Sequence, residues 1–267
     1  LFNYADDNTV LAASESVEET KSILVREGKN IMSWVTANEM QANPDKFQFI
    51  LSGRDEDTLQ IDDTEVKSQT TVKLLGVNVD NKLCFSEHIS QICHKASSQI
   101  NVLKRMCRLL DTNVKLLLYK SFIICHFNYC PAVWHACGVS NTKKLEKLQY
   151  RALKFVFNDH ISSYETLLAK ANLPTLEIAR MRNIALEVYK AYNNLNPSFI
   201  NDIFKTNKTS HSYNLRNESS MIHNRRRTTK YGLHSFNHIG VSIWNSLPSH
   251  IRTCTDFKTY KSLIHTW

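Results

Sequence analysis

The chain has 267 residues, an apolar content of 42% that is ordinary for a globular protein, and a formal net charge of +8. This length can bury one large or two small cores. The sequence has no initiator methionine, and the charged, apolar and small-residue layout of a signal peptide is absent from it, so we expect it to be part of a longer chain.

The charges are distributed unevenly along the sequence. Residues 1–81 contain 7 basic and 15 acidic side chains, residues 82–204 contain 16 and 8, and residues 205–267 contain 10 and 2. The first block is thus acidic and the next two are basic. The two basic blocks suit a polyanionic partner such as nucleic acid. On charge alone, solvated Lys and Arg faces explain the pattern equally well.

The acidic block has the pattern of short strands around one helix. LFNYADDNTVLAA at its start reads as a hairpin with Asp6 and Asp7 at the tip. Apolar residues then recur at helical spacing from Glu15 to Met40, with Gly28 as a weak point inside the predicted helix. Three strands are predicted after the helix, over residues 46–51, 59–61 and 72–79.

Beyond His88 the apolar spacing is helical. The first predicted helix runs over residues 89–110 and carries on its polar side Lys95, Lys104, Arg105 and Arg108. Further helices are predicted after a cap at Asp111 or Thr112, over residues 145–156, after the capping box Ser162-x-x-Glu165, and from Pro174 to about Asn194.

The periodicity fades from Lys205 onward. We expect a weakly ordered tail there, with one packed patch around Ile243, Trp244 and Leu247. Residues 225–227 are three consecutive arginines, for which a solvated loop is a more frequent outcome than a nucleic-acid contact. For the tryptophans at 34, 134 and 244, core packing is favoured over base stacking.

These patterns predict an α+β fold in three parts. Residues 1–84 would combine antiparallel hairpins with a helix, residues 85–204 would be all-helical, and residues 205–267 would form the basic tail.

A cluster of cysteine and histidine residues falls within the second part. Its members are Cys125, His126, Cys130, His135 and Cys137. The cluster lacks the paired C-x2-C or H-x3-H spacing of structural zinc sites, so we expect reduced thiols packed in a core. Residues 121–142 contain no Lys, Arg, Asp or Glu, but their interrupting polar residues and proline favour a buried helix and turn over a membrane span.

Several ordered motifs together carry a resemblance to a known family. They are YADD at residues 4–7, Trp34 followed by NPDK at 43–46, LLGV at 74–77 followed by Asp80, Leu83 and His88, WNSLP at 244–248, and FKTYKSL at 257–263. In this order they resemble the reverse transcriptases of non-LTR (LINE-type, jockey-like) retrotransposons, from the catalytic YxDD box of the polymerase palm to the end of the reading frame.

The resemblance implies RNA-directed DNA synthesis with two Mg²⁺ or Mn²⁺ ions, one at the primer 3′-hydroxyl and one at the triphosphate. Asp6 would bind metal directly, Asp7 would act beside it in the same electrostatic site, and Tyr4 would pack near the primer terminus. Gly76 would allow its backbone to approach the primer strand. The helices beyond His88 would resemble the thumb, where the basic residues of the first predicted helix would contact template and primer phosphates.

The sequence also departs from this family. The fingers and a further catalytic aspartate precede the YxDD box in the family, and only three residues stand before Tyr4 here. We therefore expect that the chain alone, without the N-terminal half of the polymerase, does not extend a DNA primer on an RNA template. The resemblance implies an intracellular protein with no membrane association, nuclear during the copying step. A non-catalytic nucleic-acid-binding protein and a decayed remnant are the alternatives.

Overall fold

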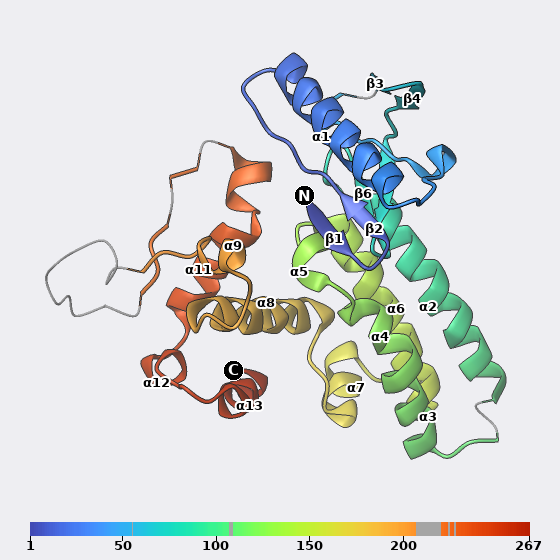
Figure 1. Cartoon of the computed structure of the whole chain (residues 1–267). Helices are drawn as coiled ribbons and strands as arrows, with labels where there is room; N and C mark the ends of the chain where they lie inside the picture. Colours follow the sequence, from blue (N-terminus) through green and yellow to red (C-terminus); the bar gives the residue numbers. More distant parts are fainter. Residues whose placement is uncertain (55, 107–108, 207–219, 224, 227) are drawn as a thin grey trace, which may run out of the picture. The chain divides into compact units, whose positions relative to one another are not determined.

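The computed structural model describes residues 1–267 apart from residues 55, 107–108, 207–219, 224 and 227 (Figure 1). The chain forms two compact units, Leu1–Phe85 and Ser86–Trp267. The boundary falls near the residue at which the sequence pattern changes from strands to helices. By itself, a mixed α and β architecture does not identify a polymerase palm or thumb.

The first unit contains three separate two-stranded antiparallel hairpins and one long helix. Its elements are β1 (Phe2–Tyr4), β2 (Asp7–Thr9), α1 (Val17–Ala37), β3 (Thr58–Ile61), β4 (Thr64–Lys67), β5 (Thr71–Leu74) and β6 (Val77–Asp80). Each hairpin turns over two residues, and the first residue of each turn has a positive φ: Ala5 at 53°, Asp62 at 51° and Leu75 at 44°.

Helix α1 is fixed by its cap and by the hairpin beneath it. The Ser16 hydroxyl accepts a hydrogen bond from the Glu19 backbone N–H at 3.1 Å and so begins the helix. A Cβ atom at Gly28 would lie 2.9 Å from the Ile61 side chain, so this glycine lets strand β3 approach the helix closely. The core beneath consists of Phe49, Leu51, Leu59 and Val66, with Val17, Leu24, Val25, Phe47 and Ile61 packed against it.

Two strand predictions in this unit are wrong. Residues 46–51 form no strand, because Asn43 caps a 3₁₀ turn at Pro44–Lys46 and only Phe49 pairs beyond it, in an isolated bridge to Ser68. The strand predicted over residues 72–79 is the β5–β6 hairpin. The prediction of a buried Trp34 is also wrong, since this side chain is 60% exposed.

The second unit begins with a series of helices. They are α2 (Ser86–Met106), α3 (Thr112–Leu118), a π-helical turn (Tyr119–Ile123), α4 (Ile124–Asn128), α5 (Pro131–Trp134), α6 (Val139–Phe157), α7 (Tyr164–Ala171), α8 (Leu176–Tyr192) and α9 (Ser198–Asn201). Asp111 caps α3 as predicted, with its carboxylate 2.9 Å from the Val114 N–H. The cap of α7 is Ser163 and not Ser162, because Ser162 is hydrogen-bonded to Asp159.

Helices α2 and α6 pack side by side and run parallel. The Asn141 amide donates to the Ser86 hydroxyl at 3.2 Å, and Arg151 Nη2 donates to Ser97 Oγ at 2.7 Å. Lys104 Nζ lies 5.4 Å from the centre of the Phe155 ring. Residue numbers on both helices therefore rise together along the contact.

The cysteine and histidine cluster lies in helices α4 and α5 and the turns around them. Cys137 is buried as predicted, but Cys125 and Cys130 are exposed, so the expectation of packed thiols is wrong for these two. Their helices are too short to cover them, since α4 and α5 bury mainly Phe127 and Trp134. Across the part of the chain that the structure describes, no helix combines the length and apolarity needed to span a membrane.

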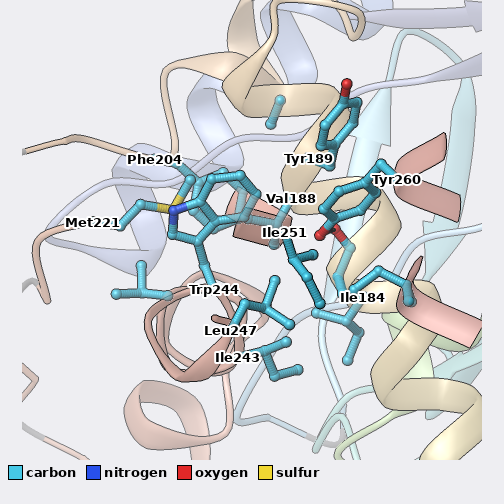
Figure 2. Close-up of a cluster of buried hydrophobic side chains, with 14 residues drawn as sticks. Ile184, Val188, Tyr189, Phe204, Met221, Ile243, Trp244, Leu247, Ile251 and Tyr260 are labelled. Atoms are coloured by element: carbon cyan, nitrogen blue, oxygen red, sulfur yellow. Dashed lines mark hydrogen bonds between the residues drawn. The ribbon is translucent and has the colours of Figure 1, made fainter. Parts of the chain in front are cut away.

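The C-terminal helices pack on α8 and form more structure than the predicted weakly ordered tail. They are a π-helical turn (Thr229–Leu233), α11 (Phe236–Ser246), α12 (Ser249–Arg252) and α13 (Phe257–Thr266). Figure 2 shows Trp244 and Tyr260 gathered with Val188 and Tyr189 of α8, and all four side chains are fully buried. The predicted patch is thus part of a larger core, which α8 completes.

Gly240 explains why α11 can lie so close to α8. A Cβ atom at this position would come within 2.8 Å of Val188 and 2.9 Å of the Phe204 ring. Such contacts are shorter than side chains tolerate, so only glycine allows this packing without rearrangement.

Candidate functional site

The YADD segment forms the first hairpin of the chain. Tyr4 pairs with Asp7 across the strands, and Ala5 and Asp6 form the turn between them. Because Tyr4 and Asp7 are directly opposite, their side chains are neighbours on one face of the hairpin. All four residues are exposed, with Tyr4 at 68%. The hairpin therefore presents two adjacent carboxylates to whatever approaches its tip.

A second hairpin with two aspartates allows a direct comparison. Asp62 and Asp63 form the turn between β3 and β4, and Asp62 lies 3.4 Å from Lys29 Nζ. The other ion pairs described in the first unit join Lys21 or Arg54 to Asp57, and Arg26 to Glu27. None of these pairs includes an aspartate of the first hairpin, so Asp6 and Asp7 differ from Asp62 in having no neutralising side chain within the described residues.

The first hairpin offers fewer metal ligands than two metal ions require. Within the described ranges, no group of three or more His, Cys, Asp and Glu side chains could hold a metal ion. Mg²⁺ is often bound by one or two protein carboxylates together with substrate phosphates and water. Asp6 and Asp7 thus offer two carboxylates, and an ion bound there would need its other ligands from outside the described residues.

The predicted primer-side residue Gly76 lies at the tip of the β5–β6 hairpin. Leu75 and Gly76 form the turn with φ values of 44° and 86°, which is the pattern of a type I′ hairpin turn. The positive φ of the turn therefore favours glycine at 76. This explanation of Gly76 is separate from the expected approach of its backbone to a primer strand. Leu74 and Leu75 beside it are 40% and 43% exposed, which is unusual for two adjacent leucines at a strand end.

Asp80, the last residue of β6, has a structural role. Its carboxylate accepts hydrogen bonds from the backbone N–H groups of Lys82 at 3.1 Å, Cys84 at 2.9 Å and Phe85 at 2.5 Å. These bonds hold the loop in which Leu83 and Phe85 both adopt positive φ, immediately before α2 begins.

The structure does not bring together all of the predicted nucleic-acid-binding residues. Lys95 and Lys104 are nine residues apart on α2, which is two and a half turns, so they point to opposite sides of the helix. Lys104 contacts α6 through Phe155, and Arg105 is exposed beside it. Arg108 lies outside the described residues.

Lys95, on the side of α2 opposite Lys104, lies near His88 of the same helix and His126 of α4. Burial, together with the nearby charge of Lys95, lowers the pKa of His88 and of His126. The His88 ring packs against Trp134, with 6.1 Å between the ring centres. His88 of the LGV motif is therefore a core residue, and Lys95 belongs to its surroundings.

A row of cations on α6 was missed by the sequence reading. Helix α6 carries Lys143, Lys144, Lys147, Arg151 and Lys154, which we call the α6 basic face. The signal was present in the sequence as steps of three and four residues between basic side chains. It was overlooked because only the apolar positions of this helix were considered.

Comparisons with known proteins give one distant relationship. No family model and no solved structure matches the chain. The chain is similar to a probable RNA-directed DNA polymerase from transposon X-element of Drosophila melanogaster, with 22% identity over 163 residues. The match covers 58% of this chain and only 18% of that protein, so the chain spans a small part of its relative's length. This similarity supports a distant, reverse-transcriptase-like relationship.

Proposed function

We propose that the chain is a fragment of a non-LTR retrotransposon reverse transcriptase, in which the first hairpin is part of the catalytic palm. The observation that carries the proposal is the exposed Asp6–Asp7 pair, which has no neutralising side chain among the described residues. The similarity to an RNA-directed DNA polymerase supports the same class of reaction.

In this proposal the protein residues position the substrates. Asp6 would bind the metal ion shared with the nucleotide phosphates, and Asp7 would hold ordered water and add negative charge beside it. Divalent ions supply the activation of the primer hydroxyl and the neutralisation of the triphosphate. The β1–β2 hairpin carries Asp6 in its two-residue turn and Asp7 on the adjoining paired strand, which limits their movement relative to the primer.

The β5–β6 hairpin would lie on the primer side. Its tip offers the backbone of Gly76 without a side chain, and the exposed Leu74 and Leu75 supply apolar surface beside it. A hairpin tip of this kind can support a sugar and base by van der Waals contact without reading sequence. RNA template and DNA primer are the partners that this proposal implies.

We expect no polymerisation by this chain alone. Two carboxylates do not fix two metal ions, and the described residues offer no third ligand near them. Primer extension on an RNA template, with Mg²⁺ and the full chain, should give no product. Product formation that disappears in Asp6→Ala would overturn this expectation.

A chimaera tests the proposed function directly. The fingers and first part of the palm of an active non-LTR reverse transcriptase, up to its YxDD hairpin, are joined upstream of Leu1. We expect Mg²⁺-dependent primer extension that falls by about a hundredfold or more in Asp6→Ala, because a metal ligand is lost.

The second hairpin supplies the matched control for this experiment. Asp63 occupies the same turn position in β3–β4 that Asp6 occupies in β1–β2. Asp63→Ala should therefore leave extension unchanged. Equal activity of the Asp6→Ala chimaera and its parent, or no extension by a chimaera whose circular dichroism shows a folded protein, would count against the proposal.

A non-catalytic nucleic-acid-binding protein is the second candidate. It is favoured by the cations of α6 and by Arg105, which form no ion pair with the described residues. Inactivity of the chimaera combined with binding of a nucleic-acid duplex would select this function.

A further inference from the structure

Arg180, near the N-terminal end of α8, is a buried cation without a carboxylate partner. The residue is 3% exposed, and the ion pairs described in the second unit do not include it. These pairs join Lys170 to Asp159 and Lys190 to Glu187. Moving a charge from water into a protein interior is unfavourable unless an opposite charge and hydrogen bonds compensate for it. The Arg180 guanidinium therefore needs compensation from another source.

The contacts of this guanidinium leave most of its hydrogen-bonding capacity unused. Nη2 donates to Thr142 Oγ1 at 3.2 Å, and the guanidinium carbon lies 5.5 Å from the centre of the Trp134 ring. Among the residues that the structure describes, Nε and Nη1 have no hydrogen-bond partner. A guanidinium has five N–H donors in a planar fork, so the donors on two of its three nitrogens are unused. Contact with the aromatic ring offsets only part of the charge.

The first turn of α6 adds positive charge beside Arg180. Thr142 belongs to this turn, and its hydroxyl lies over it because helical side chains lean toward the helix N-terminus. The N-cap is Gly138, which has no side chain to accept a hydrogen bond from the first N–H groups. The partial positive charge of the α6 N-terminus therefore lies next to the guanidinium, and two positive charges in contact favour an anion between them.

The nearby ionisable groups supply no negative charge. Burial, together with the charge of Arg180, lowers the pKa of His135, so this ring is neutral or positive. Glu146 is the acidic residue of α6, one turn beyond Thr142. Its carboxylate accepts hydrogen bonds from the N–H groups of Leu176 at 3.2 Å and Glu177 at 2.8 Å, so it stabilises the start of α8 instead.

These features favour a small free anion as the missing partner. Water could accept hydrogen bonds from Nε and Nη1, but only an anion also neutralises the charge. The phosphate of a nucleic acid or of a lipid cannot reach a side chain that is 3% exposed unless the fold opens. A monatomic anion needs the least room and accepts hydrogen bonds from any direction.

We infer that Arg180 and Thr142, beside the first turn of α6, form a binding site for a chloride ion. The ion accepts a hydrogen bond from at least one of the unused N–H groups of Arg180 and faces the positive end of α6. Because Arg180 belongs to α8 and Thr142 to α6, the bound ion stabilises the packing of these two helices (Figure 1). This inference does not depend on the proposed function.

The test measures unfolding of the full chain in urea at about 10 to 300 mM chloride, with gluconate keeping the ionic strength constant. Fluorescence of Trp134 and Trp244, both fully buried in the second unit, reports unfolding. Above the dissociation constant of chloride, each tenfold rise in its concentration should lower the unfolding equilibrium constant about tenfold. At low chloride, Arg180→Met should be at least as stable as the parent, and chloride should not stabilise it.

Two further variants make the test specific. Thr142→Val has nearly the same shape but loses the acceptor that holds Nη2, so it should need more chloride for the same stabilisation. Lys261→Met is the matched control, because it removes one positive charge from an exposed position of α13. It should keep the chloride dependence of the parent. Circular dichroism of each variant checks that the helices are retained.

Two outcomes would overturn the inference. Unfolding of the parent that does not depend on chloride would show that water alone accompanies Arg180. An equal chloride dependence in the parent, Arg180→Met and Lys261→Met would indicate a general effect of charge. If Arg180→Met does not fold, Thr142→Val decides, and an unchanged chloride dependence in that variant would count against the site. Primer extension by the chimaera bears on Asp6 and not on this result.

Discussion

The side-chain amide of Asn245 forms two hydrogen bonds with the backbone of Met221. Asn245 Nδ2 donates to the Met221 carbonyl, and Asn245 Oδ1 accepts from the Met221 N–H, each at 2.9 Å. This pair fastens an extended segment to α11, while Trp244 and Leu247 on either side enter the core. The WNSLP motif is therefore a structural element in which apolar residues pack and the asparagine holds a neighbouring chain segment.

Replacing Asn245 should destabilise the C-terminal helices. Asn245→Ala leaves the Met221 donor and acceptor without their partner, at a cost of about 1 to 3 kcal/mol in the free energy of unfolding. Urea denaturation followed by tryptophan fluorescence measures the change. Ser242→Ala on the same helix is the control, because its hydroxyl is exposed and should contribute little. Equal stability of the two variants would contradict this role of Asn245.

Replacing either of two helical glycines by alanine should change the stability of the protein in opposite directions. Gly240→Ala forces its methyl group against Val188 and the Phe204 ring inside the core, and we expect a loss of about 1 to 3 kcal/mol. Gly28→Ala would bring its methyl group to 2.9 Å from Ile61 Cδ1, which can rotate away, and to an ordinary 3.4 Å from Cγ1 and Cγ2; because it also gains helix propensity of about 1 kcal/mol, it should be neutral or slightly stabilising. Thermal melts of both variants test the pair, and a harmless Gly240→Ala would show that α11 and α8 are not in close contact.

Stability of the second unit should fall in mild acid. Burial lowers the pKa of His88, His126 and His135 below the ordinary value of 6.5. In the unfolded chain these rings take up protons below about pH 6.5, whereas the folded protein resists protonation. The unfolded state then binds more protons, so the stabilisation is present above about pH 6.5 and is lost as the pH falls below it.

His88 offers a direct check of this pH dependence. His88→Phe keeps a ring against Trp134 but has no site for a proton. Denaturation at several pH values between about 5 and 8 should show a smaller loss of stability in this variant. An identical pH profile of variant and parent would exclude His88 as a contributor.

Arg180 should be replaceable by an apolar residue. It is 3% exposed, lies over the Trp134 ring, and donates from Nη2 to Thr142 at 3.2 Å. Its Nε and Nη1 have no hydrogen-bond partner among the residues that the structure describes. Removing a buried charge without a carboxylate partner is often neutral or stabilising, so Arg180→Met should retain stability or gain about 1 kcal/mol. Arg180→Ala should be less stable because it leaves a cavity.

The helices were the most predictable part of the fold, because apolar spacing and capping residues determine them locally. Asp111 begins α3 as expected, and α8 begins after Thr175, close to the predicted start at Pro174. Strands were harder to predict, since apolar residues over 72–79 suit one strand or two. Only the positive φ values at Leu75 and Gly76 distinguish the hairpin.

The C-terminal core depended on contacts that are distant in sequence. The apolar residues of α8 and those of α11 and α13 are separated by a long polar stretch, and local periodicity gives no sign that they meet. Gly240 and Asn245 read as helix-weakening residues until their neighbours are known. In the candidate site, the YADD hairpin was evident from turn chemistry, whereas the α6 basic face required a comparison of both sides of the helix.

Because α2 and α6 run parallel, the electrostatic potential differs between the two ends of their shared surface. In parallel helices the peptide dipoles add, so the positive ends lie together at Ser86 and Val139. Lys143, Lys144 and Lys147 reinforce the positive end of α6, while Lys104, Arg105 and Lys154 offset the negative ends of their helices. The attraction felt by an anion therefore increases from the C-terminal to the N-terminal end of α6, and a charged strand lying along this surface would be held most tightly at one end.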